Sequence, residues 1–141
     1  MAKYRPRYGN KTKSQVIDLT AILRDMLEDY GEEVRQDAVE VLNELAPEIV
    51  HEVAANSPEK TGEYAKGWKS EKTTNAFGTK TVIVYNAEKP TLTHLLEFGH
   101  RGFPLKNGGR SPDVKPHPHI AKVQKWAENE AVERLERKIQ G

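Results

Sequence analysis

The residues best suited to chemistry in this chain are histidines, and four of the five gather with one glutamate within 26 residues. These are His94, Glu97, His100, His117 and His119. Imidazole binds Zn²⁺ and other transition metals, so three such ligands around an open position would form a catalytic metal site. The spacing argues against such a site, because His94 has no second histidine four residues further along a helix and a proline stiffens residues 117–119. We therefore expect no catalytic, cofactor-binding or metal-binding residues and no cofactor, and we keep a small His-dependent metallohydrolase or nuclease as an alternative.

Other routes to catalysis are also disfavoured. The chain has no cysteine, which excludes a thiol nucleophile and a Cys-ligated zinc site. None of its four serines lies in a Gly-x-Ser-x-Gly motif. Carboxylates recur at i, i+4 spacing, as in Asp25 and Asp29, which is typical of solvated helix faces rather than of a catalytic pair. The residues predict a protein that is not an enzyme.

The 141 residues carry a net charge of only +1, but the charges are segregated along the chain. Residues 1–13 hold five bases and no acid, residues 18–63 have a net charge of −10, and residues 64–125 have a net charge of +7. Such segregation suits packing between copies, in which an acidic surface of one meets a basic surface of the next. Tyr4 and Tyr8 lie among the N-terminal cations, so nucleic-acid binding through this basic arm is a second alternative.

Apolar periodicity predicts the elements that position these residues. In chain order they are a helix at 17–30, a helix at 34–55, a hairpin of 63–73 and 80–86, a short helix at 92–98, a loop of about twenty residues at 99–118 and a helix at 120–139. Pro47 is expected to kink or divide the second helix. Leu92, Leu95 and Leu96 are expected to face inward from the short helix, and Trp68 to pack against the helices.

This order predicts an α+β fold with long N-terminal helices, a small antiparallel β-sheet, a short helix, a long loop and a C-terminal helix. We expect a basic N-terminal arm at residues 1–16 and a single domain at residues 17–141. No apolar run approaches the ~20 residues of a membrane span, and no apolar stretch follows the N-terminal charges. The chain is therefore expected to be soluble, without an export signal or a membrane partner.

Four short motifs follow one another along residues 30–140. The segment from Ala54 to Tyr64 fits the pattern A-x-x-P-x-x-T-G-x-(L/Y), and the segment from Leu92 to His100 fits L-x-x-L-x-E-x-G-H. They are followed by Asn107-Gly108-Gly109-Arg110 and by Pro118-His119-Ile120, which opens the last helix. Together these motifs resemble a gene-product-ten-like tail-component family, the head–tail joining proteins of long-tailed bacteriophages, also called neck or tail completion proteins.

The resemblance implies a non-enzymatic virion protein that joins the head to the tail, as a ring subunit at the neck or tail end. Its implied partners are other copies of itself and the neck and tail proteins on either side, namely the connector or stopper and the tail terminator or tail tube. It also implies assembly in the host cytoplasm and DNA passing through the lumen of the ring. The basic N-terminal arm is additional to the family pattern.

The resembling motifs and the loop between them supply the predicted interface residues. These are Glu97, His100, Arg101, Asn107, Gly108, Gly109, Arg110 and His119. The doubled Pro-His pair at 116–119 leaves open whether His117 or His119 faces a partner. Glu97 is expected to fix the short helix to the loop through His100 or Arg101. The loop itself is expected to be flexible and to become ordered on docking.

Overall fold

The computed structural model describes residues 16–58, 62–74 and 80–141, which form a mixed helical and sheet structure. The elements, in chain order, are β1 Ile17–Asp18, α1 Thr20–Tyr30, the 3-10 turn η1 Glu32–Val34, α2 Arg35–Asn56, α3 Glu63–Lys66, β2 Trp68–Thr74, β3 Lys80–Asn86, α4 Leu92–Phe98 and α5 Ile120–Gln140. This order confirms the α+β prediction. Residues 1–15, which make up nearly all of the predicted N-terminal arm, and residues 75–79, between the two strands of the predicted hairpin, lie outside the described residues.

The sheet is antiparallel, with strand order β1-β3-β2. The hairpin partners β2 and β3 pair from Trp68 opposite Asn86 onward, and β-branched side chains of β3 face the core. Strand β1 was not predicted: Ile17 pairs with Val84 instead of beginning the first helix. Its two residues are too few for an alternating pattern to be visible in the sequence.

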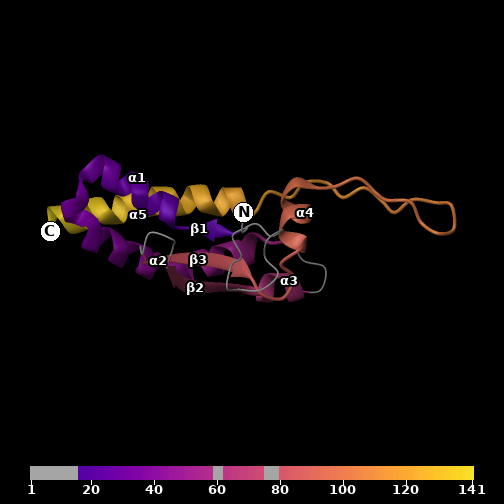
Figure 1. Ribbon diagram of the computed structural model, residues 1–141, viewed down its shortest axis with the longest axis horizontal. Helices are drawn as coiled ribbons and strands as arrows, with labels where there is room; N and C mark the ends of the chain where they lie inside the picture. The colour runs from indigo at the N-terminus through magenta and orange to yellow at the C-terminus, as the bar shows by residue number, and fades with distance from the viewer. Residues whose placement is uncertain (1–15, 59–61, 75–79) are drawn as a thin grey trace, which may run out of the picture.

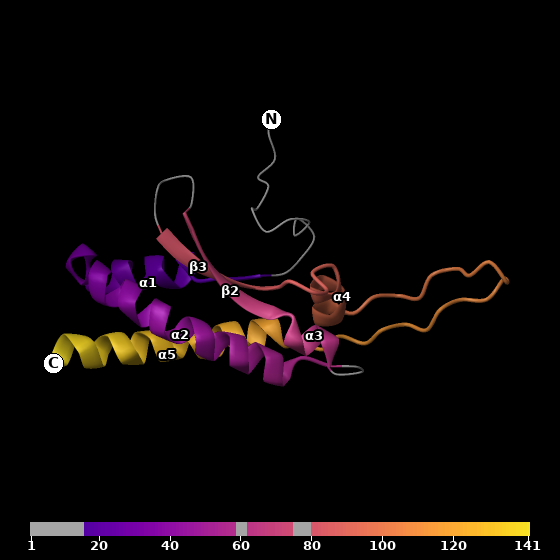
Figure 2. The ribbon, with the colours of Figure 1, turned by 90° about the horizontal axis from the view of Figure 1, so that it is seen from below.

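Three amphipathic helices pack together along the body of the molecule (Figure 1, Figure 2). Helix α2 contacts α5 along one side and the β2–β3 hairpin along another, so it forms the centre of the structure. Its apolar face, spaced at three and four residues, is fully buried at positions that include Leu45, Ile49 and Val53. Pro47 lies within α2 and does not divide it: the helix runs unbroken for 22 residues.

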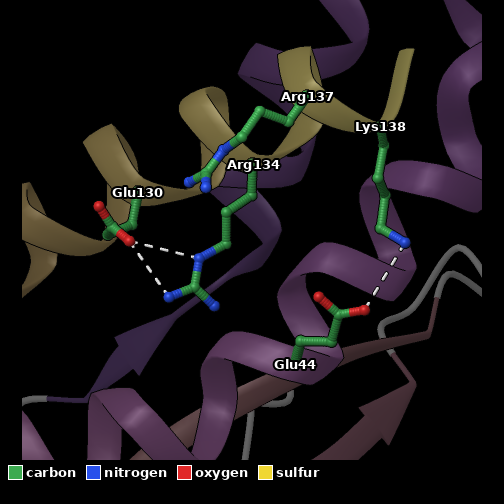
Figure 3. Close-up of a pocket in the computed structure, with 5 residues that line it drawn as sticks. All are labelled: Glu44, Glu130, Arg134, Arg137 and Lys138. Atoms are coloured by element: carbon green, nitrogen blue, oxygen red, sulfur yellow. Dashed lines mark hydrogen bonds and ion pairs between the residues drawn. The ribbon is translucent and has the colours of Figure 1, made fainter. Parts of the chain in front are cut away.

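Ion pairs join the polar faces of α2 and α5. The guanidinium of Arg134 on α5 donates two hydrogen bonds to the carboxylate of Glu48 on α2, and its Nη2 also lies 3.1 Å from Glu130 Oε1. One turn further, Lys138 Nζ lies 3.3 Å from Glu40 and 3.6 Å from Glu44 (Figure 3). These pairs neutralise much of the acidic face of α2, which the sequence alone presents as unpaired charge.

Two further expectations about the middle of the chain were wrong. The first strand of the hairpin begins at Trp68, and the residues expected to start it form the single turn α3 instead. Gly62 allows this turn because it has a left-handed φ of +79°, which favours glycine. In α4, Leu92 and Leu96 are partly buried and pack against the core as expected, but Leu95 is exposed and the buried residues are Thr93 and Glu97.

Candidate functional site: a projecting loop with a buried anchor

Residues 99–118, named here the projecting loop, extend well beyond the helices and the sheet (Figure 1, Figure 2). The loop is a two-stranded hairpin held by main-chain hydrogen bonds, not the structureless segment that its composition suggested. His100 and Val114 exchange bonds of 3.0 and 2.8 Å, and the N–H of Ser111 donates to the carbonyl of Phe103 over 2.9 Å. The loop is therefore paired along its length and not structureless, while its flexibility in the free protein and its ordering on docking stay predictions.

The tip of the projecting loop is a tight turn built from the Asn-Gly-Gly-Arg motif. The N–H of Gly108 donates to the carbonyl of Leu105, and Gly108 has a φ of +86° that a non-glycine residue rarely adopts. The amide oxygen of Asn107 accepts the N–H of Gly109 over 3.0 Å. Asn107, Gly108 and Gly109 thus have a structural function in reversing the chain.

Gly102 lets the two strands of the loop come together. A Cβ atom at this position would lie 1.8 Å from the carbonyl oxygen of Ser111, which is far inside van der Waals contact with the main chain. Two side chains of the returning strand strengthen the pairing: Asp113 accepts the N–H of Gly102 over 2.6 Å, and Arg110 donates from Nη2 to the Gly102 carbonyl. Arg110 is therefore part of the internal bracing of the loop.

The loop presents apolar and cationic side chains to solvent. Phe103 is 57% exposed and Leu105 is 40% exposed, and Phe98 at the base of the loop is as exposed as Phe103. Arg101, Lys106 and Lys115 are exposed among them. Exposed aromatic and apolar side chains gathered on and beside one projecting hairpin are a candidate recognition surface.

Both strands of the loop are fixed at its base by the buried carboxylate of Glu97. Glu97 lies on α4, immediately before the outgoing strand, and is only 4% exposed. Its Oε1 accepts the main-chain N–H groups of His119 and Ile120, each over 2.8 Å, and its Oε2 accepts that of Ala121 over 3.0 Å. These three donors belong to the start of α5, where helix N–H groups have no partner within the helix.

Glu97 therefore does fix the shape of this region, but through different partners from those predicted. The sequence suggested His100 or Arg101, whereas the structure shows main-chain groups of α5, so the carboxylate joins the helix before the loop to the helix after it. A main-chain bond of 2.8 Å from His117 to the carbonyl of Leu96 closes the base beside it. The direction of the loop is set by these bonds.

The bonds from Glu97 to the start of α5 form the anchor of the loop. A buried cluster of aromatic and polar side chains packs beside this anchor. His119 is fully buried, and its Nδ1 lies 2.7 Å from the carbonyl of His117, so this nitrogen carries the proton and donates it. Nε2 therefore accepts the hydroxyl of Tyr64 over 2.7 Å. The ring of Trp68 packs edge-on against both rings, and its Nε1 donates to Ser57 Oγ over 2.8 Å.

The ionisation states in the cluster follow from burial and from these hydrogen bonds. Burial lowers the pKa of His119 despite the nearby Glu97 carboxylate, which favours the neutral ring. Burial opposes the charge of Glu97, but the hydrogen bonds from three main-chain donors lower its pKa, so Glu97 is ionised. Burial raises the pKa of Tyr64, which keeps its hydroxyl as a donor. The neutral ring of His119 therefore lies between the Tyr64 hydroxyl and the Glu97 carboxylate in a structural role, and both of its nitrogens are hydrogen-bonded.

The structure separates the predicted interface residues into two groups. Glu97 and His119 are buried and engaged in the anchor, so neither faces a partner in this conformation. The remaining residues belong to the projecting loop, and they are His100, Arg101, Asn107, Gly108, Gly109 and Arg110. His117 is exposed and its Nε2 donates to the main-chain carbonyl of Asn56 over 3.2 Å. An interface role for the loop residues stays a prediction.

Sequence reasoning did not find the cluster that supports the anchor. Tyr64, Trp68 and Ser57 come from α3, β2 and the end of α2, and are brought together only by tertiary packing. One signal was available, since Ser57 and Tyr64 both fall within the first of the four motifs. The histidines do not converge on a metal site: within the described ranges, no three His, Cys, Asp or Glu side chains lie where they could hold a metal ion.

Comparison with known proteins identifies the family to which these features belong. The family model described as "Bacteriophage HK97-gp10, putative tail-component" matches residues 21–99, which is more than half of the chain. The chain belongs to this family of phage tail components. No curated protein and no solved structure matches the chain.

Membership in this family gives the protein a structural role in a bacteriophage tail and points to a non-catalytic component of the virion. The match covers α1 through α4, including Glu97, and ends at Gly99, where the projecting loop begins. None of the helices in the described part of the chain is long and apolar enough to cross a membrane.

Proposed function

We propose that this protein joins the phage head to the tail, as a ring subunit at the neck or tail end, and that the projecting loop makes the joining contact. The observation that carries the proposal is the loop itself: an ordered hairpin, fixed at its base, that holds apolar and cationic side chains away from the body. Family membership supplies the tail-component role, and the loop supplies a means of contact.

A rigid loop suits a connection between preformed structures. Its main chain is already paired, and Glu97 fixes its base, so little conformational entropy is lost when a partner binds. The partners proposed are the connector or stopper on the head side, the tail terminator or tail tube on the tail side, and neighbouring copies in the ring. We further propose that the ring is assembled in the host cytoplasm and that DNA passes through its lumen.

Complementation of a phage that lacks this protein tests the proposal. The variant Arg101→Glu with Lys106→Glu reverses two exposed charges of the loop that have no hydrogen bond or ion pair among the described residues. We expect the variant to fold, as measured by circular dichroism, and to leave separate heads and tails in lysates viewed by electron microscopy. Arg110 is left unchanged because its bond to Gly102 braces the loop.

The matched control reverses two lysines on the exposed face of α5, as Lys122→Glu with Lys125→Glu. It has the same net charge as the loop variant and is expected to give normal virion yield. Normal yield from the loop variant would contradict the role of the loop in joining. Equal loss from both variants would show that net charge, and not the loop, causes the defect.

The two alternatives raised by the sequence are less well supported by the geometry. Both ring nitrogens of His119 are engaged with Tyr64 and His117, so this histidine is not free to act as a metal ligand or base. The basic N-terminal residues that suggested nucleic-acid binding lie outside the described residues.

A further inference from the structure

We propose that the projecting loop of one copy docks on the opposite end of the next copy, against a surface named here the acidic end. The acidic end consists of residues 25–33, at the close of α1 and in η1, together with the last turn of α5. This inference rests on the proposed assembly of copies into a ring and specifies which two surfaces meet.

The first support is the placement of opposite charges at the two ends of the molecule. Residues 25–33 contain five acids and no base, while residues 99–118 contain four bases and one acid. The turn between α1 and α2 and the tip of the loop lie at opposite ends of the longest axis (Figure 1, Figure 2). Because the loop is fixed at its base, its cations cannot reach the acidic end of their own copy. A second copy can supply the opposite charge to each end.

Three of the cations near the acidic end already form ion pairs, while Arg24, one residue before it, is exposed and forms none with a described residue. Arg35 donates to Glu32 in a two-bond ion pair, Lys138 lies against Glu40 and Glu44 on α2, and Arg137 lies 3.8 Å from Glu133. Four exposed acids remain that form no ion pair with any residue the structure describes, namely Asp25, Glu28, Asp29 and Glu33. This surface therefore has a surplus of negative charge for an incoming cation.

The second support is apolar. Five large hydrophobic side chains in the described part of the chain are exposed, and four are on or beside the loop: Leu95, Phe98, Phe103 and Leu105. The fifth, Ile139, lies in the last turn of α5 and is 44% exposed. This turn lies beside residues 25–33, since Tyr30 at the end of α1 donates its hydroxyl to Glu136. Each end thus offers an apolar contact beside charges that match the other end.

A contact between two different surfaces of the same protein repeats from copy to copy. Such heterologous contacts close into a ring when the rotation between copies allows it. In the proposed contact, the projecting loop of each copy binds the acidic end of one neighbour, and its own acidic end binds the loop of the other neighbour. This arrangement accounts for association of the chain with itself without a further protein.

Crosslinking of the full-length purified chain tests which surfaces meet. The natural chain has no cysteine, so single thiols can be introduced at uncharged positions: Leu105→Cys on the loop and Gln140→Cys beside the acidic end. The two variants, one of them isotope-labelled, are mixed at low ionic strength and treated with a short bismaleimide. We expect products that join position 105 to position 140 to exceed both same-position products. Asn129→Cys, on the exposed face of α5, is the control.

Charge exchange provides a second measurement of the same contact by sedimentation. Arg101→Glu with Lys106→Glu, or Glu28→Lys with Asp29→Lys, should each weaken self-association at least about tenfold, because like charges then face each other. All four changes in one chain restore opposite charges and should restore association. Predominant loop-to-loop crosslinks, no association of the natural chain, or no recovery in the fourfold variant would each overturn the inference.

The outcome is separable from that of the proposed function. Suppose that the loop variant loses head–tail joining but no crosslink forms between positions 105 and 140. This result would support the joining role of the loop and overturn the contact between copies. Crosslinks between positions 105 and 140, together with normal virion yield from the loop variant, would keep the contact and overturn the joining role of the loop.

Discussion

The carboxylate of Glu97 and the main-chain N–H of His119 are 22 positions apart in the chain and 2.8 Å apart in space. The twenty residues of the projecting loop leave and return between them. Glu97 is thus an N-terminal cap supplied to α5 from another helix, and the same bond that begins the helix also closes the loop. Capping residues normally come from the chain just before the helix, which explains why the sequence does not reveal this one.

Removal of this carboxylate should destabilise the whole domain. Glu97→Ala leaves three main-chain donors at the start of α5, two of them buried, without an acceptor. We expect the free energy of unfolding, measured by urea denaturation, to fall by about 2 to 4 kcal/mol. Glu28→Ala, on the exposed face of α1, should change it by less than about 0.5 kcal/mol. Equal effects of the two variants would contradict the anchoring role.

Buried His119 should make stability depend on pH below neutrality. Burial lowers its pKa in the folded state from the ordinary value of 6.5, so the unfolded chain binds a proton more readily. The free energy of unfolding should therefore decrease as the pH falls below about 6.5, and this contribution should level off below the folded pKa. His119→Gln should show a shallower decrease than the natural chain. His51→Gln, at an exposed histidine of α2, should keep the full slope.

Gly102 should be required for the loop and dispensable for the body. Gly102→Ala places a methyl group against the Ser111 carbonyl, so the strands must separate. We expect hydrogen exchange at the Ser111 and Val114 amides to accelerate at least about tenfold while helix amides keep their protection. In Gly109→Ala the nearest atom to the new methyl group is the movable Asn107 side chain, at 3.3 Å, and exchange should stay slow. Fast exchange in the natural chain would contradict the ordered hairpin.

Trp68 should contribute strongly to stability, as its 4% exposure indicates. Trp68→Ala removes a ring that packs on Tyr64 and His119 and should cost about 3 to 5 kcal/mol in unfolding free energy. Trp68→Phe keeps most of the packing and loses the hydrogen bond to Ser57, so its cost should be about 1 to 3 kcal/mol. Phe98→Ala, at an exposed aromatic, is the control. An unchanged melting curve for Trp68→Ala would place this side chain outside the core.

The helices were predictable because their apolar residues repeat over many turns. The stripes that end at Tyr30 and at Val53, and the one that begins at Ile120, became buried faces as expected. Strand β1 was missed because two residues show no period, and its pairing depends on Val84, which is distant in the chain. Pro47 was expected to kink or divide α2; it does not divide it, because burial on both sides of the proline holds one continuous helix.

The candidate site was predictable in position but not in construction. Length and composition marked residues 99–118 as functional, while cross-strand bonds such as that between Ser111 and Phe103 depend on three-dimensional approach. The histidines drew attention to this region as possible metal ligands, and the structure gives His119 a different chemical role. His119 was considered as a ligand or interface residue, and it is a buried, neutral hydrogen-bonding partner of Tyr64.

Because the projecting loop is closed at its base, its length can change with little effect on the stability of the domain. The bonds of Glu97 to α5 and of His117 to Leu96 tie the chain together before and after the loop, so residues added at the tip change only a segment already closed on itself. Lengthening a closed loop costs little, because the entropy of closure grows only with the logarithm of its length. If the loop makes the proposed joining contact, insertions or deletions near Gly108 would change the distance it spans while the helices and sheet that hold it stay the same.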